Sequence, residues 1–402
     1  MPTTPEPSAR SQLTLLAVGL VFAMTTWFAA AAVIGELRAE FDLSTTGGAW
    51  LTIAVQLGFV IGALVSAVAN LADRVPPRRL VLIGATVAAV ANLSLLVADG
   101  LFEAALGRAL TGAGLALVYP AALKAASTWF VQGRGVALGV MVGALTVGSA
   151  VPHLVSGVGG VDWRGTVVAT SVLTVAGGLL TDRRGVDGPY SFSRGAFDPR
   201  RALRVATDRE LRLATLGYFG HMWELYAMWA WFGLFYADVL ERGGVADADR
   251  WASLATFAVI AVGALGSVAA GRMSDRRDRE TAAGVALVTS AVMAASIGFA
   301  VDAPPLLVLA LGLVWGFAVV ADSAQFSTIV SEVARPDDVG TALTTQLASG
   351  FVLTVFTIFL VPEVQARLGW GVAFLALAPG PIMGAVAMHA LRRGRTPATA
   401  PV

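Results

Sequence analysis

Long apolar runs separated by short polar loops restrict the fold of this chain more than any other feature of its sequence. A helix needs roughly 20 apolar residues to cross a hydrocarbon core about 30 Å thick, and only a helix satisfies the backbone of such a segment in lipid. Charged residues make up 14% of the chain, against about 25% in soluble domains, so we expect an all-α membrane protein. Twelve windows qualify as transmembrane helices: Leu13–Ile34, Trp50–Leu71, Leu80–Val97, Leu101–Thr128, Val136–Val158, Gly165–Leu180, Leu213–Tyr236, Trp251–Ala270, Ala282–Val301, Pro305–Val330, Ala342–Val361 and Gly371–Leu391.

A short charged loop occurs twice between these windows. Asp73-Arg74 lies in the first copy and Asp275-Arg276 in the second, an offset of 275 − 73 = 202 residues, close to half of the 402-residue chain. This repetition indicates a duplication and predicts two pseudo-symmetric bundles of six helices joined by one polar stretch. The predicted organisation is a tail at 1–12, a first bundle at 13–181, a linker at 182–212, a second bundle at 213–391 and a tail at 392–402.

The distribution of positive charge gives the expected orientation. With the N-terminus in the cytoplasm, 21 of the 28 lysines and arginines fall on the cytoplasmic side. Cytoplasmic loops of membrane proteins carry such an excess, so we expect both termini inside. The use of arginine in place of lysine, with abundant alanine, valine and glycine, indicates a GC-rich bacterial genome and a multi-pass protein of the bacterial plasma (inner) membrane.

The two charged loops resemble the signature Gly-x-x-x-Asp-Arg-x-Gly-Arg-Arg/Lys that the major facilitator superfamily carries between helices 2 and 3 and echoes between helices 8 and 9. In the first copy, Asn70 replaces the leading glycine. The segment Arg108-x-x-x-Gly112-x-Gly114 is similar to the helix-4 motif of that family. The resemblance covers nearly the whole chain and implies a twelve-helix transporter in two pseudo-symmetric bundles.

Two further segments, His221–Trp229 and Val151–Leu154, are similar to a bacterial branch loosely grouped with nitrate/nitrite-type carriers. Those carriers hold arginines inside helices 2 and 8, whereas Trp50–Leu71 and Trp251–Ala270 contain none in their interiors. The resemblance therefore leaves the substrate unassigned.

Ionisable residues within the apolar windows are the candidate site residues, because each is costly in lipid and usually faces a cavity or a partner. In the seventh window, His221, Glu224 and Trp231 lie within one stripe at 100° per residue, with Tyr218 at its edge. Near the middle of the membrane, Glu224 would bind and release protons as water access alternates between the two sides. The alternative is that His221 and Glu224 only satisfy each other at i,i+3.

A second carboxylate, Asp322, lies near the middle of the tenth window with Gln325 close by. The offset of 202 residues places Pro120 at the corresponding position of the first half, so the two halves differ here. We predict proton or substrate binding at Asp322 and Gln325. The alternative is an aspartate that is hydrogen-bonded to neighbouring hydroxyl and amide groups.

Three basic side chains complete the set of buried candidates. Lys124 is the only lysine in the chain and suits an anion or a coupling proton, although it could also extend to the cytoplasmic surface. Arg108 lies 16 residues before it, about 160° around a straight helix, and has either a structural or a direct role. His153 shares a stripe with Thr146 and Ser149 and relays protons or is simply hydrogen-bonded near a helix end.

The repeated loops are the predicted gates. Charge pairs at helix ends form a natural two-state latch, and in the superfamily such loops hold helix ends together in one conformation. We therefore assign Asp73, Arg74, Asp275 and Arg276 to gating. The alternative, charge that only sets the membrane topology, explains the arginines but not the aspartate that precedes each of them.

These features together predict a proton-coupled secondary active transporter that moves a small polar or anionic organic solute by alternating access. The runner-up is proton-antiport efflux of lipophilic or cationic compounds, which the replacement of the helix-5 Gly-Pro pair by Val151-Pro152 disfavours. The expected partners are the solute, protons and the lipid bilayer, and the protein is expected to be a monomer. A net charge of +1 gives no reason to expect nucleic acid.

Enzymes and sensors are remote alternatives. The chain has no cysteine for a thiolate centre and no Gly-x-Ser-x-Gly elbow, and His221-x-x-Glu224 lacks the second histidine of a zinc protease motif. We predict that the protein is not an enzyme and that it needs no metal or cofactor.

Overall fold

The computed structural model describes residues 8–130, 133–159, 161–190, 202–335 and 338–395. These residues form helices and no β-strand. The first half contains α1 (Ala9–Ala23), α2 (Ala29–Ala32), α3 (Ile34–Glu40), α4 (Thr45–Val68), α5 (Leu71–Arg74), α6 (Pro77–Leu93), α7 (Leu101–Ser127), α8 (Arg134–Gly159) and α9 (Trp163–Arg184). The second half contains α10 (Leu203–Thr207), α11 (Arg209–Arg242), α12 (Ala248–Ala261), α13 (Gly263–Arg276), α14 (Arg279–Ser296), α15 (Pro305–Ala321), α16 (Ser323–Val333), α17 (Val339–Leu375) and α18 (Pro379–Gly394).

Within the described ranges, nine helical stretches are long and apolar enough to cross a membrane. The last of them, Val339–Gly394, covers both of the final two predicted windows. Of the other two predicted windows, one corresponds to α1, which has only 15 residues, and one to α11, which is rich in tryptophan and tyrosine and carries His221 and Glu224. The prediction of an all-α, membrane-spanning fold is confirmed.

The duplication is visible in the element boundaries. Helices α6 and α14 begin at Pro77 and Arg279, an offset of 279 − 77 = 202 residues, and each continues into a 3₁₀ turn. The long α4 and α7 of the first half correspond in order to the pairs α12–α13 and α15–α16 of the second. The predicted boundaries of the tails and linker stay a prediction, because residues 191–201 lie outside the described part of the chain.

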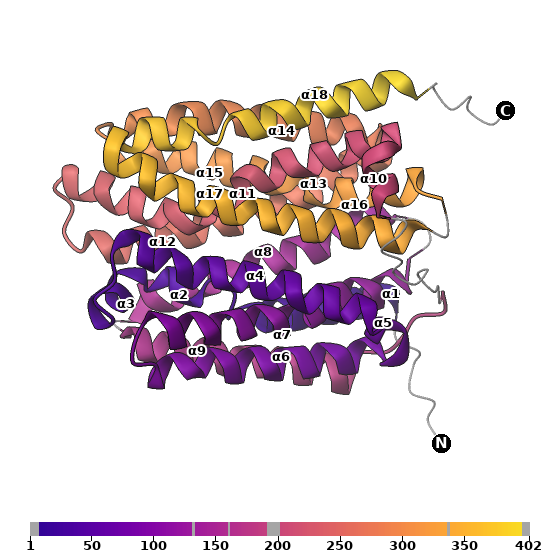
Figure 1. The fold of residues 1–402 in the computed structure, drawn as a ribbon, viewed down its shortest axis with the longest axis horizontal. Helices are drawn as coiled ribbons and strands as arrows, with labels where there is room; N and C mark the ends of the chain where they lie inside the picture. The colour runs from indigo at the N-terminus through magenta and orange to yellow at the C-terminus, as the bar shows by residue number, and fades with distance from the viewer. Residues whose placement is uncertain (1–7, 131–132, 160, 191–201, 336–337, 396–402) are drawn as a thin grey trace.

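The two halves form two layers that meet along the middle of the molecule (Figure 1). Helix α8 packs along α12 and α13, and α4 packs along α17, so both halves contribute to each seam. Glycine permits the close approach at the first seam: a Cβ on Gly139 would lie 2.7 Å from the Ser267 carbonyl oxygen. We call the end with α5, α10 and the end of α18 the termini end, and the opposite end, with α3, the far end (Figure 1).

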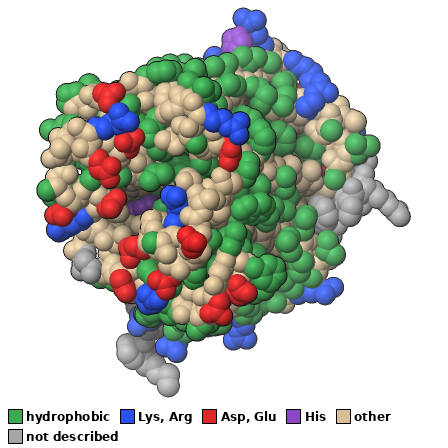
Figure 2. Space-filling model, turned by 60° about the vertical axis from the view of Figure 1, so that its left-hand side comes forward, with side chains coloured by type: hydrophobic (Ala, Val, Ile, Leu, Met, Phe, Trp, Pro, Cys, Tyr) green, Lys and Arg blue, Asp and Glu red, His purple; other side chains and the backbone are tan. Residues whose placement is uncertain are grey.

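The flank of the bundle is apolar. Hydrophobic side chains cover it, whereas acidic and basic side chains gather on the far end (Figure 2). On α14, the exposed residues Val285, Val288 and Val292 follow a helical spacing. Such an exposed apolar stripe is the surface that lipid solvates.

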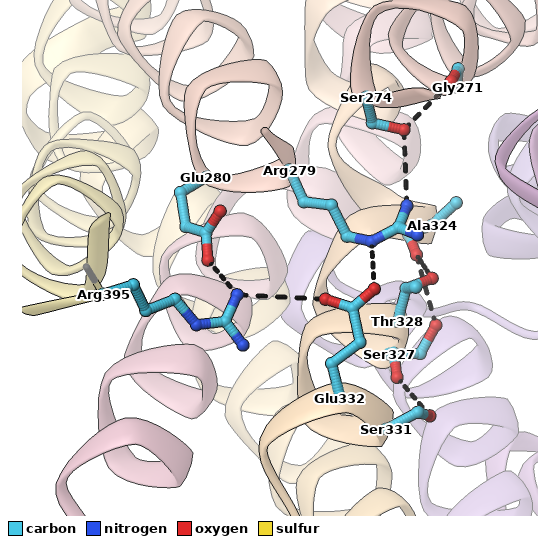
Figure 3. A network of polar contacts seen from close by, with 10 residues as sticks. All are labelled: Gly271, Ser274, Arg279, Glu280, Ala324, Ser327, Thr328, Ser331, Glu332 and Arg395. Carbon is cyan, nitrogen blue, oxygen red and sulfur yellow. Dashed lines mark hydrogen bonds and ion pairs between the residues drawn. The ribbon is translucent and has the colours of Figure 1, made fainter. Parts of the chain in front are cut away.

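A cluster of ion pairs at the termini end of the second half joins three helices (Figure 3). Arg395, just after α18, donates to the buried Glu280 of α14 at 2.5 Å and lies 3.8 Å from Glu332 of α16. Arg279 pairs with Glu332 at 2.7 Å. The cluster therefore joins the end of α18 to α14 and α16 of the same half.

Asp278 caps α14 and allows a pH test of this region. Its carboxylate accepts hydrogen bonds from the backbone N–H of Thr281 at 2.7 Å and from its hydroxyl at 2.5 Å, and it pairs with Arg392 at 3.3 Å. Partial burial opposes ionisation, but these hydrogen bonds and the charge of Arg392 outweigh it and hold the pKa of Asp278 below its ordinary value.

We expect Asp278→Ala to lower stability by about 1 kcal/mol, the usual cost of losing an N-cap. Asp278→Asn keeps a capping oxygen and should lose only the part that depends on charge. Because the pKa is lowered in the folded state, that part is present above the unfolded pKa of about 3.9 and is lost as pH falls through the folded pKa. In thermal unfolding in detergent at a series of pH values, the difference in melting temperature between wild type and Asp278→Asn should therefore shrink as the pH is lowered. A difference in melting temperature that does not change with pH would contradict a charge-dependent contribution of Asp278.

Candidate functional site

A cavity of about 590 Å³ lies between the two halves. Along α7 its lining runs from Ala116 to Ser127, about 16 Å at 1.5 Å per residue. Asn70, Lys124 and Ser331 lie at its outer part, where α4, α7 and α16 reach the termini end. The cavity thus extends from the termini end and stops between the two halves. Alternating access requires a chamber of this geometry.

Aromatic rings from both halves close the inner end of the cavity. Trp27 of the first half stacks on Tyr226 at 5.7 Å and on Phe351 at 5.8 Å between ring centroids, and Phe28 meets Trp229 at 5.6 Å. Four of these rings line the cavity, and we call them the aromatic floor: Trp27, Tyr226, Trp229 and Phe351.

Two further contacts between the halves lie on α4. On this helix the cavity lining ends at Ala63, and one turn further in Phe59 packs on Phe351 at 4.5 Å. At the start of α4, Thr46 donates to Glu363 of α17 at 2.7 Å. The halves are thus in contact from the aromatic floor to the far end.

Trp27 and Phe28 lie in a break of the first transmembrane segment, between the end of α1 and the start of α2. Backbone carbonyls in such a break lack helical partners. Arg108 of α7 supplies them, donating to the carbonyl oxygens of Thr26 at 3.0 Å and of Trp27 at 2.5 Å. The guanidinium is completely buried, so Arg108 fixes the backbone of the floor residue Trp27.

Asn92 of α6 holds Arg108 in place. Its side-chain oxygen accepts a hydrogen bond from Arg108 at 2.6 Å, and its side-chain nitrogen donates to Ser171 of α9 at 3.0 Å. Asn92 is also completely buried. The pair therefore links four transmembrane segments around the break, and Arg108 lies behind the cavity wall rather than in its lining.

His221 of α11 connects the cavity with a buried carboxylate. Its Nδ1 lies 2.8 Å from the carboxylate of Asp322, and its Nε2 lies 2.9 Å from the hydroxyl of Ser323. His221 and Ser323 line the cavity, while Asp322, which is 2% exposed, lies behind them. Asp322 falls between α15 and α16, which together make one predicted span, so the carboxylate lies at an interruption of that helix.

Glu224 lies one turn further along α11 and faces α14 instead. It accepts a hydrogen bond from the hydroxyl of Ser290 and is 1% exposed. Each of His221 and Glu224 therefore contacts a different neighbouring helix, whereas the alternative from the sequence paired them with each other. Gln325 is buried near this group, and within the described part of the chain its side-chain amide makes no hydrogen bond.

Comparison with known proteins identifies the family. The sequence model of the Major Facilitator Superfamily matches residues 16–247, more than half of the chain. The chain belongs to this superfamily. It is a multi-pass membrane transporter and not an enzyme, as the sequence predicted.

A solved superfamily structure has a similar fold. The proton:xylose symporter XylE, bound to 6-bromo-6-deoxy-D-glucose, aligns over 95% of both chains with a TM-score of 0.69 and 15% sequence identity. At this identity the likeness concerns the fold alone. A search of curated proteins found no match.

The two repeated superfamily loops carry the predicted gating residues. Asp275, which is exposed, approaches Gly135 so closely that a Cβ on this glycine would meet its carboxylate. Gly135 lies in the first turn of α8, where the helix dipole favours a negative charge, so Asp275 reaches across the seam between the halves. Arg74 and Arg276 are exposed. The side chain of Asp73 lies outside the described residues.

Of the nine candidates within the apolar windows, three line the cavity: Lys124, Tyr218 and His221. Asp322, Glu224 and Gln325 lie behind its second-half wall. Trp231 donates to the Ile358 carbonyl oxygen at 2.9 Å, and His153 is buried on α8; neither lines the cavity.

Sequence reasoning missed the residues that need a partner from another helix. Trp27, Phe351, Asn92 and Ser290 fall in this group. The only available signal was the polar asparagine within an apolar window, because a buried amide needs partners.

Proposed function

We propose that this protein is a proton-coupled secondary active transporter of organic anions. One observation carries the proposal. The described lining of the cavity contains one lysine and one histidine but no carboxylate, while Asp322 and Glu224 are buried behind its wall. Among the described residues, the basic side chains of Lys124 and His221 thus line the chamber, whereas no acidic side chain does.

The charge of the lining decides between the candidate solutes. A bound organic cation would meet Lys124 and no compensating carboxylate among the described lining residues, so its desolvation would be uncompensated. A neutral sugar would not need an ammonium group in the lining. An anion gains a charge-assisted contact with Lys124.

The coupling proton is assigned to the second half. Protons from cavity water reach His221 directly, and Asp322 is in contact with its other ring nitrogen. Glu224 provides a second buried carboxylate with a serine partner. A histidine that lines the cavity and contacts a buried carboxylate is suited to passing a proton between the two.

The remaining assignments follow from the sequence. We expect Asp73, Arg74, Asp275 and Arg276 to latch the ends of the halves, and the contact of Asp275 with α8 supports this. The termini end is expected to face the cytoplasm of a bacterium, with the protein a monomer in the inner membrane.

The test is substrate-induced proton movement in proteoliposomes that contain a pH-sensitive dye. We expect organic monoanions to change the internal pH, and quaternary ammonium compounds and neutral sugars to have no effect. Protein-free liposomes correct for passive entry of protonated acids. Proton movement with cations but not with anions would establish the antiport efflux alternative instead.

A further inference from the structure

We infer that an anionic phospholipid binds at a fixed place on the first half, where the start of α6 meets the end of α9. Its phosphate contacts arginines at the termini end, and its acyl chains lie along the outer faces of the two helices. This lipid site is separate from the solute cavity, and it does not depend on which solute is transported.

Helices α6 and α9 lie side by side and pack along their length in one antiparallel register (Figure 1). Toward the far end, Asn92 of α6 donates to the hydroxyl of Ser171 of α9 at 3.0 Å. Nearer the termini end, a Cβ on Gly178 of α9 would lie 2.9 Å from the Cβ of Ala85 of α6. Each step back along α6 therefore matches a step forward along α9.

The same register brings two pairs of arginines together at the termini end. Arg78, in the first turn of α6, donates to the carbonyl oxygen of Gly185, directly after α9, at 3.4 Å. Arg79 follows on α6, and Arg183 and Arg184 are the last two residues of α9. All four arginines are exposed.

Two of these arginines continue the lipid-facing stripes of their helices. The exposed apolar residues of the two stripes are Ile83, Val87 and Val90 on α6 and Val168 and Val172 on α9. At 100° per residue, Arg79 and Arg183 each fall within the stripe of their own helix, which is at most about 80° wide. A positive group therefore stands at the termini end of each apolar stripe.

The corresponding place in the second half neutralises its own charge. There, Arg392 of α18 pairs with Asp278 at 3.3 Å, and Arg395 pairs with Glu280 of α14 at 2.5 Å. The offset of 202 residues places Arg78 at the position of Glu280. Where the second half carries a carboxylate that holds an arginine, the first half thus carries one more arginine.

The first half has no such counter-charge among its described residues. Arg78, Arg79, Arg183 and Arg184 make no ion pair there, and the one acidic residue of the two helix ends is Asp182, so these ends carry a net charge of 4 − 1 = +3. Charge that only sets the membrane topology would explain the arginines but not this difference between the halves. An anion from outside the chain supplies the missing charge.

A phospholipid matches both parts of the site. Guanidinium groups bind phosphate through charge-assisted hydrogen bonds, and basic pockets between transmembrane helices are typical sites for anionic headgroups. The apolar stripes next to the arginines then contact the acyl chains. A water-soluble anion would use the arginines alone, so the combination of charge and stripe favours a lipid.

The test is native mass spectrometry of the purified, delipidated full chain in detergent during titration with lipid. The probes are phosphatidylglycerol, phosphatidylcholine with the same acyl chains, and glycerol 3-phosphate, which is anionic but has no acyl chain. We expect the first molecule of phosphatidylglycerol to bind about tenfold more tightly than phosphatidylcholine. Glycerol 3-phosphate should not displace it.

Variants locate the site. Arg79→Gln combined with Arg183→Gln should weaken phosphatidylglycerol about tenfold and leave phosphatidylcholine unchanged, whereas Arg79→Lys with Arg183→Lys should keep most of the affinity. The matched control, Arg272→Gln with Arg393→Gln, removes two exposed arginines from the same end of the second half and should have no effect. Phosphatidylglycerol should also raise the melting temperature of the parent and the control, but not that of the first variant.

Three results would overturn the inference. Equal affinity for the two lipids, or unchanged binding after loss of Arg79 and Arg183, would remove the site. An equal loss in the control variant would show attraction to the whole basic end instead of a fixed place. Displacement by glycerol 3-phosphate would assign the arginines to a water-soluble anion.

Discussion

Replacing Arg108 with glutamine is expected to reduce transport by at least a hundredfold and to open the far end of the protein to water. The arginine donates to the carbonyl oxygens of Thr26 and Trp27 and to the side-chain oxygen of Asn92, at 2.5–3.0 Å. A shorter amide cannot satisfy all three, and each unsatisfied buried acceptor costs about 1–3 kcal/mol. The break that presents Trp27 to the aromatic floor would lose its support.

A cysteine reporter distinguishes this effect from general destabilisation. The chain contains no cysteine, so a single Ala31→Cys substitution in α2, beyond the floor, gives a clean site. A membrane-impermeant maleimide added from the far side should label it slowly in the parent and at least tenfold faster with Arg108→Gln. Asn92→Ala should have the same effect, and the double variant should add little to it.

Thr111→Val is the matched control, because Thr111 is buried on the same helix and, among the described residues, its hydroxyl bonds only to the carbonyl oxygen of Gly107. It should leave labelling unchanged. Normal transport and protected labelling in Arg108→Gln would show that the arginine does not hold the gate.

Replacing Asp322 with asparagine is expected to abolish transport driven by a pH gradient, by a factor of at least a hundred, while counterflow of solute continues. An amide has the shape of the carboxylate but does not carry the proton, and His221 then loses its charged partner 2.8 Å away. If both carboxylates serve coupling, Glu224→Gln should likewise abolish gradient-driven transport while counterflow continues.

The measurements are uptake in proteoliposomes with an imposed pH gradient and exchange at equal pH. Asp302→Asn is the control, because it removes an exposed carboxylate that pairs with Arg242 at 2.9 Å, outside the described cavity lining. Unchanged gradient-driven uptake in both Asp322→Asn and Glu224→Gln would remove the coupling assignment.

The fold was predictable because it follows from local and periodic signals. The spacing of apolar runs predicted the spans, and the repeated aspartate–arginine loops predicted an offset that the starts of α6 and α14 reproduce. These signals depend on neighbours in sequence or on a fixed repeat, and so they are readable without coordinates.

The site was only partly predictable because it depends on the helices that surround each side chain. His221 and Glu224 share a stripe of α11, yet about 60° separates them, which is enough for one to face the junction of α15 and α16 and the other α14. Arg108 looked like a candidate ligand residue, and only the break before α2 shows which carbonyl groups it satisfies.

The ring stack between the halves has a consequence for turnover. Every passage between inward- and outward-facing forms has to separate Trp27 from Tyr226 and Phe351, and aromatic pairs contribute about 0.5–1.5 kcal/mol each beyond their buried area. A solute that packs on the aromatic floor contacts ring faces that would otherwise lose their partners. The solute-bound transporter should therefore change conformation faster than the empty one. Exchange of one solute molecule for another should then be faster than net transport.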